Sequence, residues 1–445
     1  MEFEKTIKRQ AVVVIHGIGE QRPMETLRGF VSGVKQKLEE LDEAEKKSTV
    51  RSKPDSIGDI YETVRLSMDS TAKRPITDFY EFYWAHNMRN TKISQMSTWF
   101  KRLVFAKRSK VPPALKSLYD TVWVLLIAAP VIAYFVSSYF SSKPLNQFLA
   151  PFITATVFPF IMSFLATTFK SVFLNYAGDA ARYFTPEPDN IGERSHIRQQ
   201  GIQFLQKLHT ISNNEKVDRI ILVGHSLGTV VAYDLLRLLW TEYNRQYDEL
   251  PEVNQEYLEQ INKYANGSEV LDQNSLDKFR DLQYKVWKEQ RQVGNKWLIS
   301  DFVTLGAAIN AIDYFMVTDE KVDNLIQQRE LPICPPTKDE KDNNIYYNSY
   351  PAYTLADGQK RTVKLLNHAG LFAACRWTNI YYSCDFVGGP MTRIFGKGIK
   401  DICIQRKSLW ILPGGHTKYW DKSDSQNALT LIVNAMQLNS KVIPQ

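Results

Sequence analysis

The chain has 445 residues and a net charge of +7, with 44% hydrophobic and 23% charged residues. These fractions are ordinary for a globular protein, and the sequence shows none of the internal repeats or biased stretches of a repeat or low-complexity protein. A charge of this size suits an anionic membrane as well as nucleic acid, so the position of the basic residues matters more than their sum.

The first predicted element is a strand at residues 11–15, an apolar run that leads directly into His16-Gly17-Ile18-Gly19. This arrangement resembles the oxyanion loop of α/β-hydrolases, in which a backbone N–H after His-Gly faces the developing oxyanion. The donor in this chain would be Ile18. An ordinary turn between a strand and a helix is the alternative.

An amphipathic helix is predicted for residues 26–46, because the apolar residues there recur on one face. Residues 60–68 and 79–84 are rich in Tyr, Phe and Val and are predicted as strands. We expect both strands to extend the sheet beside the first one.

Residues 101–116 hold six basic residues and no acidic one. Two uncharged runs follow at 121–142 and 144–169. As helices they would be about 33 Å and about 39 Å long, against a hydrocarbon core of about 30 Å. We therefore predict a helical hairpin in the membrane within residues 118–170. A pair of buried helices, or a hairpin that enters only one leaflet, is the alternative.

The basic segment at 101–116 also assigns a side of the membrane. Lys and Arg beside membrane helices stay on the cytoplasmic side, where they attract anionic lipid headgroups. The strands before and after the hairpin are expected to share one sheet, so the chain has to cross the bilayer an even number of times. The folded domain would then lie on the cytoplasmic side.

After the hairpin, the pattern predicts a helix at 195–209, a buried strand at 220–224 and a second helix from Thr229. Between this strand and helix stands Gly224-His225-Ser226-Leu227-Gly228, a G-x-S-x-G turn. Such a turn forces the serine into a strained conformation, with its side chain projecting from the end of the sheet. Ser226 lies at a helix N-terminus, where negative charge is favoured, and is the candidate nucleophile. A glycine-rich corner with a structural serine is the alternative.

The remaining chain supplies two further strand ends that carry polar residues. Residues 241–300 are polar and helical and would form either a lid or a plain packed helix, whereas 317–360 indicate a surface excursion. Strands are predicted at 301–305, at 377–384 and at 408–412, and a last helix at 427–438. Asp385 follows the second of these strands and His416 follows the third.

A serine becomes a good nucleophile only when a base takes its proton, and the base needs an acid that fixes its tautomer. Ser226, Asp385 and His416 occur in that chain order, each after a strand. With the His-Gly-x-Gly loop, this order makes the chain resemble the serine esterase/lipase branch of the α/β-hydrolase superfamily. The resemblance implies an acyl-enzyme on Ser226, His416 as general base and then general acid, and Asp385 as orienting acid. It also implies an oxyanion hole formed by the N–H groups of Ile18 and Leu227.

Other residues compete for these roles. Asp301 and Asp313 lie near another strand end and are rivals for the orienting acid. His368 precedes Asp385 and so falls in the wrong order for the base, while His16 and His225 are expected to pack inside their loops.

The predicted fold is therefore α/β, with a doubly wound, mostly parallel sheet and an inserted helical hairpin. Residues 1–99 would form the first part of the core, 100–175 the basic segment and hairpin, and 176–445 the remainder. The resemblance does not extend to 85–175 or to 317–360.

We expect a membrane-associated serine hydrolase that cleaves carboxylic esters, in particular those of lipids, as lipases and phospholipases do. The catalytic domain would face the cytoplasm. The same groups would also serve a thioesterase or an esterase of small esters. Two further alternatives are a non-catalytic membrane scaffold and a lipid-targeting toxin delivered into another cell.

No cofactor, metal or nucleic acid is expected, because the chain has no nucleotide-binding glycine pattern, zinc spacing or nucleic-acid motif. The four cysteines form no C-x-x-C pair, which favours free thiols in a reducing compartment. The N-terminus lacks the apolar run of a cleaved signal peptide.

Overall fold

The computed structural model describes most of the chain outside the predicted hairpin. The described residues are 7–17, 22–42, 48–58, 60–87, 188–212, 215–247, 254–267, 272–311, 322–348, 353–354, 360–361, 363–385, 387–405, 415–421 and 426–439, with single or paired residues between 107 and 138 and Tyr183. The chain divides into two compact units. One comprises Met1–Asn87, Glu193–Asp313 and Thr318–Gln445, and the other Met88–Gly192 and Tyr314–Val317.

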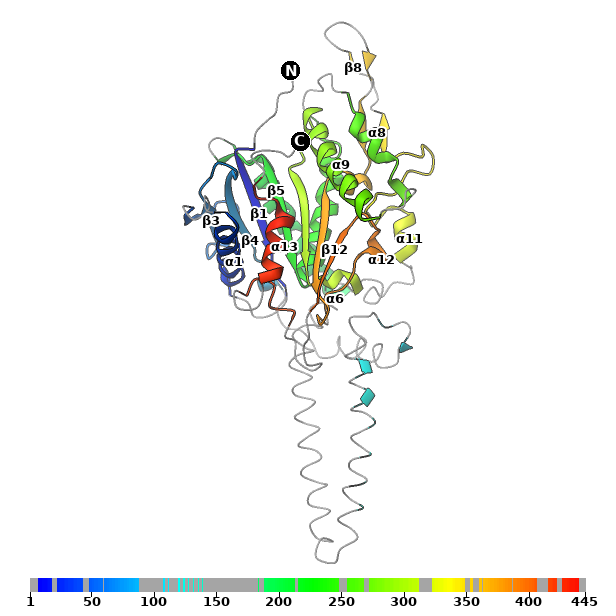
Figure 1. Ribbon diagram of the computed structural model, residues 1–445. Coiled ribbons are helices and arrows are strands. Elements are labelled where there is room, and N and C mark those ends of the chain that lie inside the picture. Colours follow the sequence, from blue (N-terminus) through cyan, green and yellow to red (C-terminus); the bar gives the residue numbers. More distant parts are fainter. Residues whose placement is uncertain are drawn as a thin grey trace, which may run out of the picture. The chain divides into compact units, whose positions relative to one another are not determined.

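The first unit is built on a sheet in which the described strands follow the order β12-β11-β6-β5-β1-β4-β3-β2 (Figure 1). These strands are β1 (Arg9–Ile15), β2 (Val50–Pro54), β3 (Val64–Met68), β4 (Ile76–Phe82), β5 (Arg219–His225), β6 (Ile299–Leu305), β11 (Arg376–Tyr382) and β12 (Lys400–Ile404). Pairing is parallel from β12 through to β4 and antiparallel only where β3 and β2 complete one edge. The predicted α/β class with a mostly parallel sheet is confirmed.

Short strands form two further pairs among the described residues. β7 (Tyr346–Asn348) pairs with β10 (Lys364–Leu366), and β8 (Tyr353–Thr354) pairs with β9 (Lys360–Arg361). The described helices are α1 (Glu25–Leu41), α6 (Pro188–Thr210), α7 (Gly228–Tyr243), α8 (Glu256–Asn262), α9 (Gln273–Gln292), α11 (Val322–Gln327), α12 (Thr392–Phe395) and α13 (Gln426–Met436), with 3₁₀ turns η2 (Ala85–Asn87), η7 (Ala265–Gly267), η8 (Ala308–Ala311) and η9 (Gly370–Ala373).

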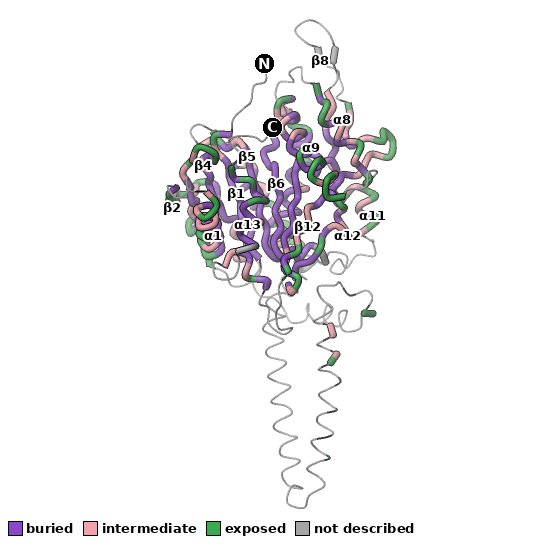
Figure 2. The backbone as a smooth tube through the Cα atoms, viewed as in Figure 1, coloured by how far each residue is buried: buried purple, intermediate pink, exposed green. Residues whose placement is uncertain are grey.

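The central strands are apolar because both faces of the sheet are covered. Every residue of β5 and β6 is buried (Figure 2), as expected for parallel strands between two helical layers. On one face, α1 and α13 share a hydrophobic core with alternate residues of the strands. On the other face, α6 packs Phe204 against Tyr80 and Phe82 of β4, and α7 packs Tyr233 against Trp377 of β11.

Two strands of the sheet were not predicted. β2 is partly exposed and ends in Pro54, which is typical of an edge strand that lacks an apolar face. β12 carries Lys400 and Asp401 at its start, so its apolar run is too short to stand out. The strand predicted at 408–412 lies outside the described residues.

The hairpin predicted within residues 118–170 also lies largely outside the described residues. Among the residues that the structure does describe, no helix combines the length and the apolar character needed to cross a bilayer. The transmembrane hairpin therefore stays a prediction.

Candidate active site

The turn between β5 and α7 holds Ser226 in a conformation that is rare for a residue with a side chain. Ser226 has φ 54°, in the left-handed region, although it is not a glycine. Its N–H donates to the carbonyl of Leu305 at 3.0 Å, and its own carbonyl accepts from the N–H of Thr229 at 3.0 Å. The side chain is 3% exposed. Hydrogen bonds to β6 and to α7 therefore keep this serine at a fixed place on the strained turn.

Glycines let the end of β1 approach this turn closely. A Cβ on Gly17 would lie 2.6 Å from the Cβ of Ser226 and 3.1 Å from its Oγ. A Cβ on Gly228 would lie 2.2 Å from the carbonyl oxygen of Ile15. Neither position has room for a side chain, so the G-x-S-x-G and His-Gly sequences are explained by packing. Together they place Ser226, the start of α7 and the end of β1 in direct contact.

Asp385 and His416 form a buried hydrogen-bonded pair. The Nδ1 atom of His416 lies 2.9 Å and 3.0 Å from the two carboxylate oxygens of Asp385. Tyr419 donates its hydroxyl to the same carboxylate at 2.7 Å, and the N–H of Val387 donates at 2.8 Å. With Nδ1–H donating to the carboxylate, Nε2 is the nitrogen of His416 that can accept a proton.

The surroundings of Asp385 keep this carboxyl ionised. Burial alone would raise its pKa, but the His416 ring and the hydrogen bonds from His416, Gly388 and Tyr419 hold the pKa at about 2. Burial, and then the charge of Asp385, raise the pKa of Tyr419 well above its ordinary value. At neutral pH the carboxylate is thus negative and Tyr419 remains a proton donor.

His225 connects this pair to the serine turn. Its ring stacks on the ring of His416 at a centroid distance of 5.0 Å, and its Nε2 lies 2.8 Å from the backbone oxygen of His416. Burial, and then the neighbouring His416, lower the pKa of His225 to about 3, so it stays neutral. The residue before Ser226 therefore positions His416 by packing.

Gly306, directly after β6, lies close to both Asp385 and His416. A Cβ there would lie 2.7 Å from an Asp385 oxygen and 3.0 Å from Nδ1 of His416. The preceding residue, Leu305, accepts the hydrogen bond from Ser226. Ser226 follows β5 and Asp385 follows β11, the strands on either side of β6, so both lie at the carboxyl edge of the sheet, where α/β sheets place their ligands. His416 lies at the same edge against Asp385.

The structure also places the other predicted site residues. Leu227 is buried at the N-terminus of α7, where the first N–H groups have no partner within the helix. Ile18 and Asp313 lie outside the described residues. Asp301 pairs with Arg219 at 2.6 Å and with Arg376 at 2.8 Å, toward the amino end of β6, so it is engaged away from His416.

Tyr419 and Gly306 are site residues that the sequence analysis missed. Tyr419 follows His416 by three residues, and its proximity to an acid at 385 is a property of the fold with no local signal.

Within the described residues, no group of three or more His, Cys, Asp or Glu side chains could hold a metal ion. The four cysteines all lie within the described residues and form no disulfide with one another.

Comparison with protein-family models, with curated proteins and with solved structures finds no match to this chain. Its function can therefore be inferred only from the geometry of the site.

Proposed function

We propose that this protein is a serine hydrolase of carboxylic esters and a member of the serine esterase/lipase branch of the α/β-hydrolase superfamily. One observation carries the proposal. A serine in a strained left-handed conformation, between a buried parallel strand and a helix, lies at the same sheet edge as a buried His416–Asp385 pair. A serine with only a structural role in a glycine-rich turn would need neither the strained conformation nor a buried, ionised acid beside a histidine.

The proposed reaction has two steps. Nε2 of His416 takes the proton of Ser226 as Oγ attacks the ester carbonyl carbon, and the negative charge moves to the carbonyl oxygen. The N–H of Leu227 at the start of α7, with that of Ile18, would stabilise this oxyanion. His416 then gives its proton to the leaving alcohol, which leaves an acyl group on Ser226. A water molecule, deprotonated by His416, releases the acid, while Asp385 stabilises the imidazolium in both steps.

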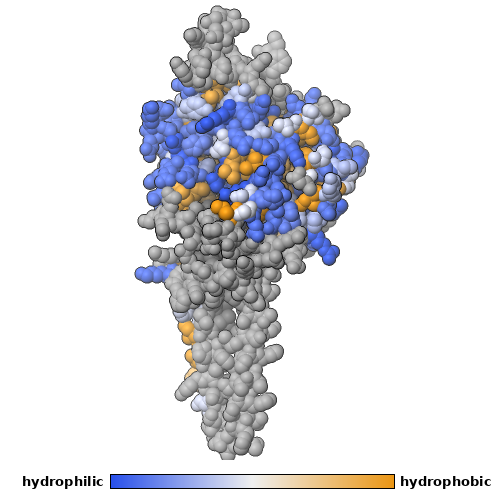
Figure 3. All heavy atoms as spheres, turned by 180° about the vertical axis from the view of Figure 1, so that it is seen from behind, coloured by the Kyte–Doolittle hydropathy of each residue, from blue (hydrophilic) through white to orange (hydrophobic). Residues whose placement is uncertain are grey.

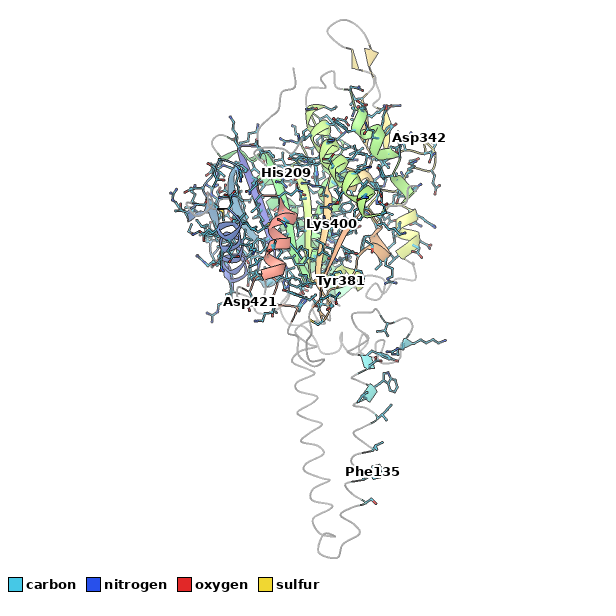
Figure 4. The ribbon with its side chains drawn as sticks, in the orientation of Figure 1. Phe135, His209, Asp342, Tyr381, Lys400 and Asp421 are labelled. Carbon is cyan, nitrogen blue, oxygen red and sulfur yellow. The ribbon has the colours of Figure 1, made fainter. Side chains whose placement is uncertain are left out.

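Lipid esters are the proposed substrates, because the second unit exposes apolar side chains. Val124, Ile127, Val131 and Phe135 are 62%, 59%, 46% and 65% exposed. Spacings of three and four residues put them on one face of a helix. Figure 3 shows several described residues of this unit as hydrophobic, and Figure 4 labels Phe135. Contact with a bilayer at this face, which follows the basic segment 101–116 in the sequence, would bring the enzyme to its substrate.

Labelling with a fluorophosphonate tests the nucleophile. The probe phosphonylates only activated serines, so the wild-type protein should label and Ser226→Ala should not. Ser52→Ala, which removes an exposed hydroxyl on β2, is the matched control and should label like the wild type. Labelling that survives Ser226→Ala would contradict the proposal. A wild-type protein that does not label would also contradict it and would favour the non-catalytic scaffold.

A substrate panel then separates the remaining hydrolase alternatives. Phospholipids, neutral lipid esters, short esters and acyl thioesters are offered to wild type and to Ser226→Ala under the same conditions. Turnover of lipid esters at a higher kcat/KM than short esters or thioesters is the expected result. A preference for thioesters or for short esters would show that these compounds, and not lipid esters, are the substrate class.

A further inference from the structure

A cavity of about 300 Å³ lies between α9 and α13, over the first residues of β11 and β12. Its polar lining includes Arg280 and Tyr284 from α9, Arg376 from β11 and Lys400 from β12. Of these residues, Figure 4 labels Lys400. Its apolar lining includes Ile402, Leu431 and Ala435. The volume lies at the lower end of the range for small-molecule sites.

Arg280 is a buried cation whose neighbours do not neutralise it. It is 9% exposed and donates to the carbonyl of Trp377 at 2.7 Å and to the hydroxyl of Thr378 at 2.8 Å. In the part of the chain that the structure describes, no carboxylate forms an ion pair with it. Burial, and then the positive charge of Arg376, lower the pKa of Arg280 to about 10.

Two exposed acidic residues, Asp277 and Asp281, also line the cavity, and each pairs with a lysine. Asp277 pairs with Lys400 at 3.5 Å, and Asp281 pairs with Lys285 at 2.8 Å. Asp301 is shared between Arg219 and Arg376. Three buried guanidinium groups, those of Arg219, Arg280 and Arg376, therefore face one buried carboxylate. Such an excess of buried positive charge is costly unless an anion joins it.

Tyr284 gives a second, independent indication of a ligand. It is 8% exposed, and its buried hydroxyl has no hydrogen-bond partner among the described residues. The guanidinium carbon of Arg376 lies 4.5 Å from the centre of its ring, which fixes the ring against the cavity wall. A buried hydroxyl without a partner costs free energy that a bound acceptor would recover.

We propose that this cavity binds a small organic anion. Its carboxylate or phosphate oxygens accept hydrogen bonds from Arg280, Lys400 and the hydroxyl of Tyr284. A short apolar body packs on Ile402, Leu431 and Ala435. The cavity lies toward the amino ends of the strands and the serine turn at their carboxyl ends, so this site is separate from the proposed active site and independent of the proposed function.

Isothermal titration calorimetry on the full chain tests the site. The probes are inorganic phosphate, hexanoate and hexyl phosphate, each measured against chloride at the same ionic strength. Saturable binding is expected, with at least one of the two six-carbon probes bound about tenfold or more tightly than inorganic phosphate, because its chain fills the apolar part of the cavity. The ratio of hexanoate to hexyl phosphate affinity identifies which anionic group the site prefers.

Single substitutions assign the binding to this cavity. Arg280→Gln should abolish binding, and Lys400→Gln and Tyr284→Phe should each weaken it by about fivefold or more. The last two variants change a partly exposed amine and one hydroxyl, so they decide the outcome if Arg280→Gln does not fold. Lys278→Gln, an exposed position on α9, and Ser226→Ala should bind like the wild type. The proposal is overturned if the wild type shows no saturable binding, or if Lys400→Gln and Tyr284→Phe bind as tightly as it does.

Discussion

Asp385 is surrounded by donors that serve one purpose, which is to keep a buried carboxylate negative beside His416. Its pKa of about 2 results from His416 and from hydrogen bonds that include Tyr419. An acid in this state fixes the tautomer of the imidazole and stabilises it when it gains a proton. Asp234 on α7 shows that a lowered pKa alone is no sign of catalysis, because its pKa is lowered by arginines that include its ion-pair partners Arg237 and Arg198.

Asp385→Asn should reduce kcat by about 10³-fold to 10⁴-fold, because the amide can present an N–H to Nδ1 and so favour the wrong tautomer. Steady-state ester hydrolysis and the rate of fluorophosphonate labelling should fall together. Tyr419→Phe removes only one donor to the carboxylate, so its effect should be near tenfold. Equal rates in Asp385→Asn and wild type would show that this acid is structural.

The strand–turn–helix element around Ser226 depends on glycines more than on the serine itself. β1, β5 and the N-terminus of α7 meet where a Cβ on Gly228 would lie 2.2 Å from the Ile15 carbonyl oxygen and 2.4 Å from that of His16. Both obstacles are backbone atoms and cannot rotate away. The strand and the helix would have to separate to admit a methyl group.

Gly228→Ala should therefore destabilise the protein by on the order of 3 kcal/mol, the upper range for overpacking, and should also slow labelling of Ser226. Urea unfolding gives the free energy and the labelling rate gives the effect on the turn. Gly192→Ala on α6 is the matched control, since no atom lies within 4 Å of its added Cβ. That substitution should leave stability unchanged or raise it by up to about 1 kcal/mol. If Gly228→Ala unfolds at the same urea concentration as Gly192→Ala, the close approach of β1 to α7 does not require a glycine at position 228.

Prediction from sequence succeeded for elements whose signal is local. β1 and β5 each contain an uninterrupted apolar run, and the parallel, doubly covered sheet buries nearly every residue of both strands. β2 and β12 carry mixed polar residues at a sheet edge, so no periodicity marks them. The position of Asp385 beside His416 followed from chain order, whereas Tyr419 needed the fold.

Candidate site residues are easier to identify from the sequence at the carboxyl ends of the strands than at the amino ends. At the carboxyl ends of the strands, the His-Gly loop after β1 and the G-x-S-x-G turn after β5 are recognisable motifs, each confined to one loop. The cationic cavity lies toward the amino ends and takes its residues from α9, β11, β12 and α13, with no motif in any of them. In the sequence, nothing distinguishes Arg280 from an ordinary charged residue on a helix. Only the structure shows that Arg280 is buried and that none of the described carboxylates forms an ion pair with it.

At the scale of the whole molecule, the exposed face of Val124, Ile127, Val131 and Phe135 should decide whether the protein reaches a bilayer. Replacing all four with Ser should weaken binding to phosphatidylcholine–phosphatidylserine vesicles by about a hundredfold or more, since each buried apolar side chain contributes about 1.5–3 kcal/mol. Co-sedimentation with the vesicles measures this.

The control for that experiment replaces exposed apolar residues elsewhere, Leu41 and Tyr61, which are 52% and 102% exposed in the first unit. Their loss should leave vesicle binding unchanged, because scattered apolar side chains form no continuous face. Added salt should weaken the wild type and the fourfold variant alike, since the basic segment 101–116 is intact in both. If the fourfold variant sediments with vesicles as the wild type does, this face does not enter the bilayer. Attraction by the basic segment would then be the remaining route to a lipid substrate.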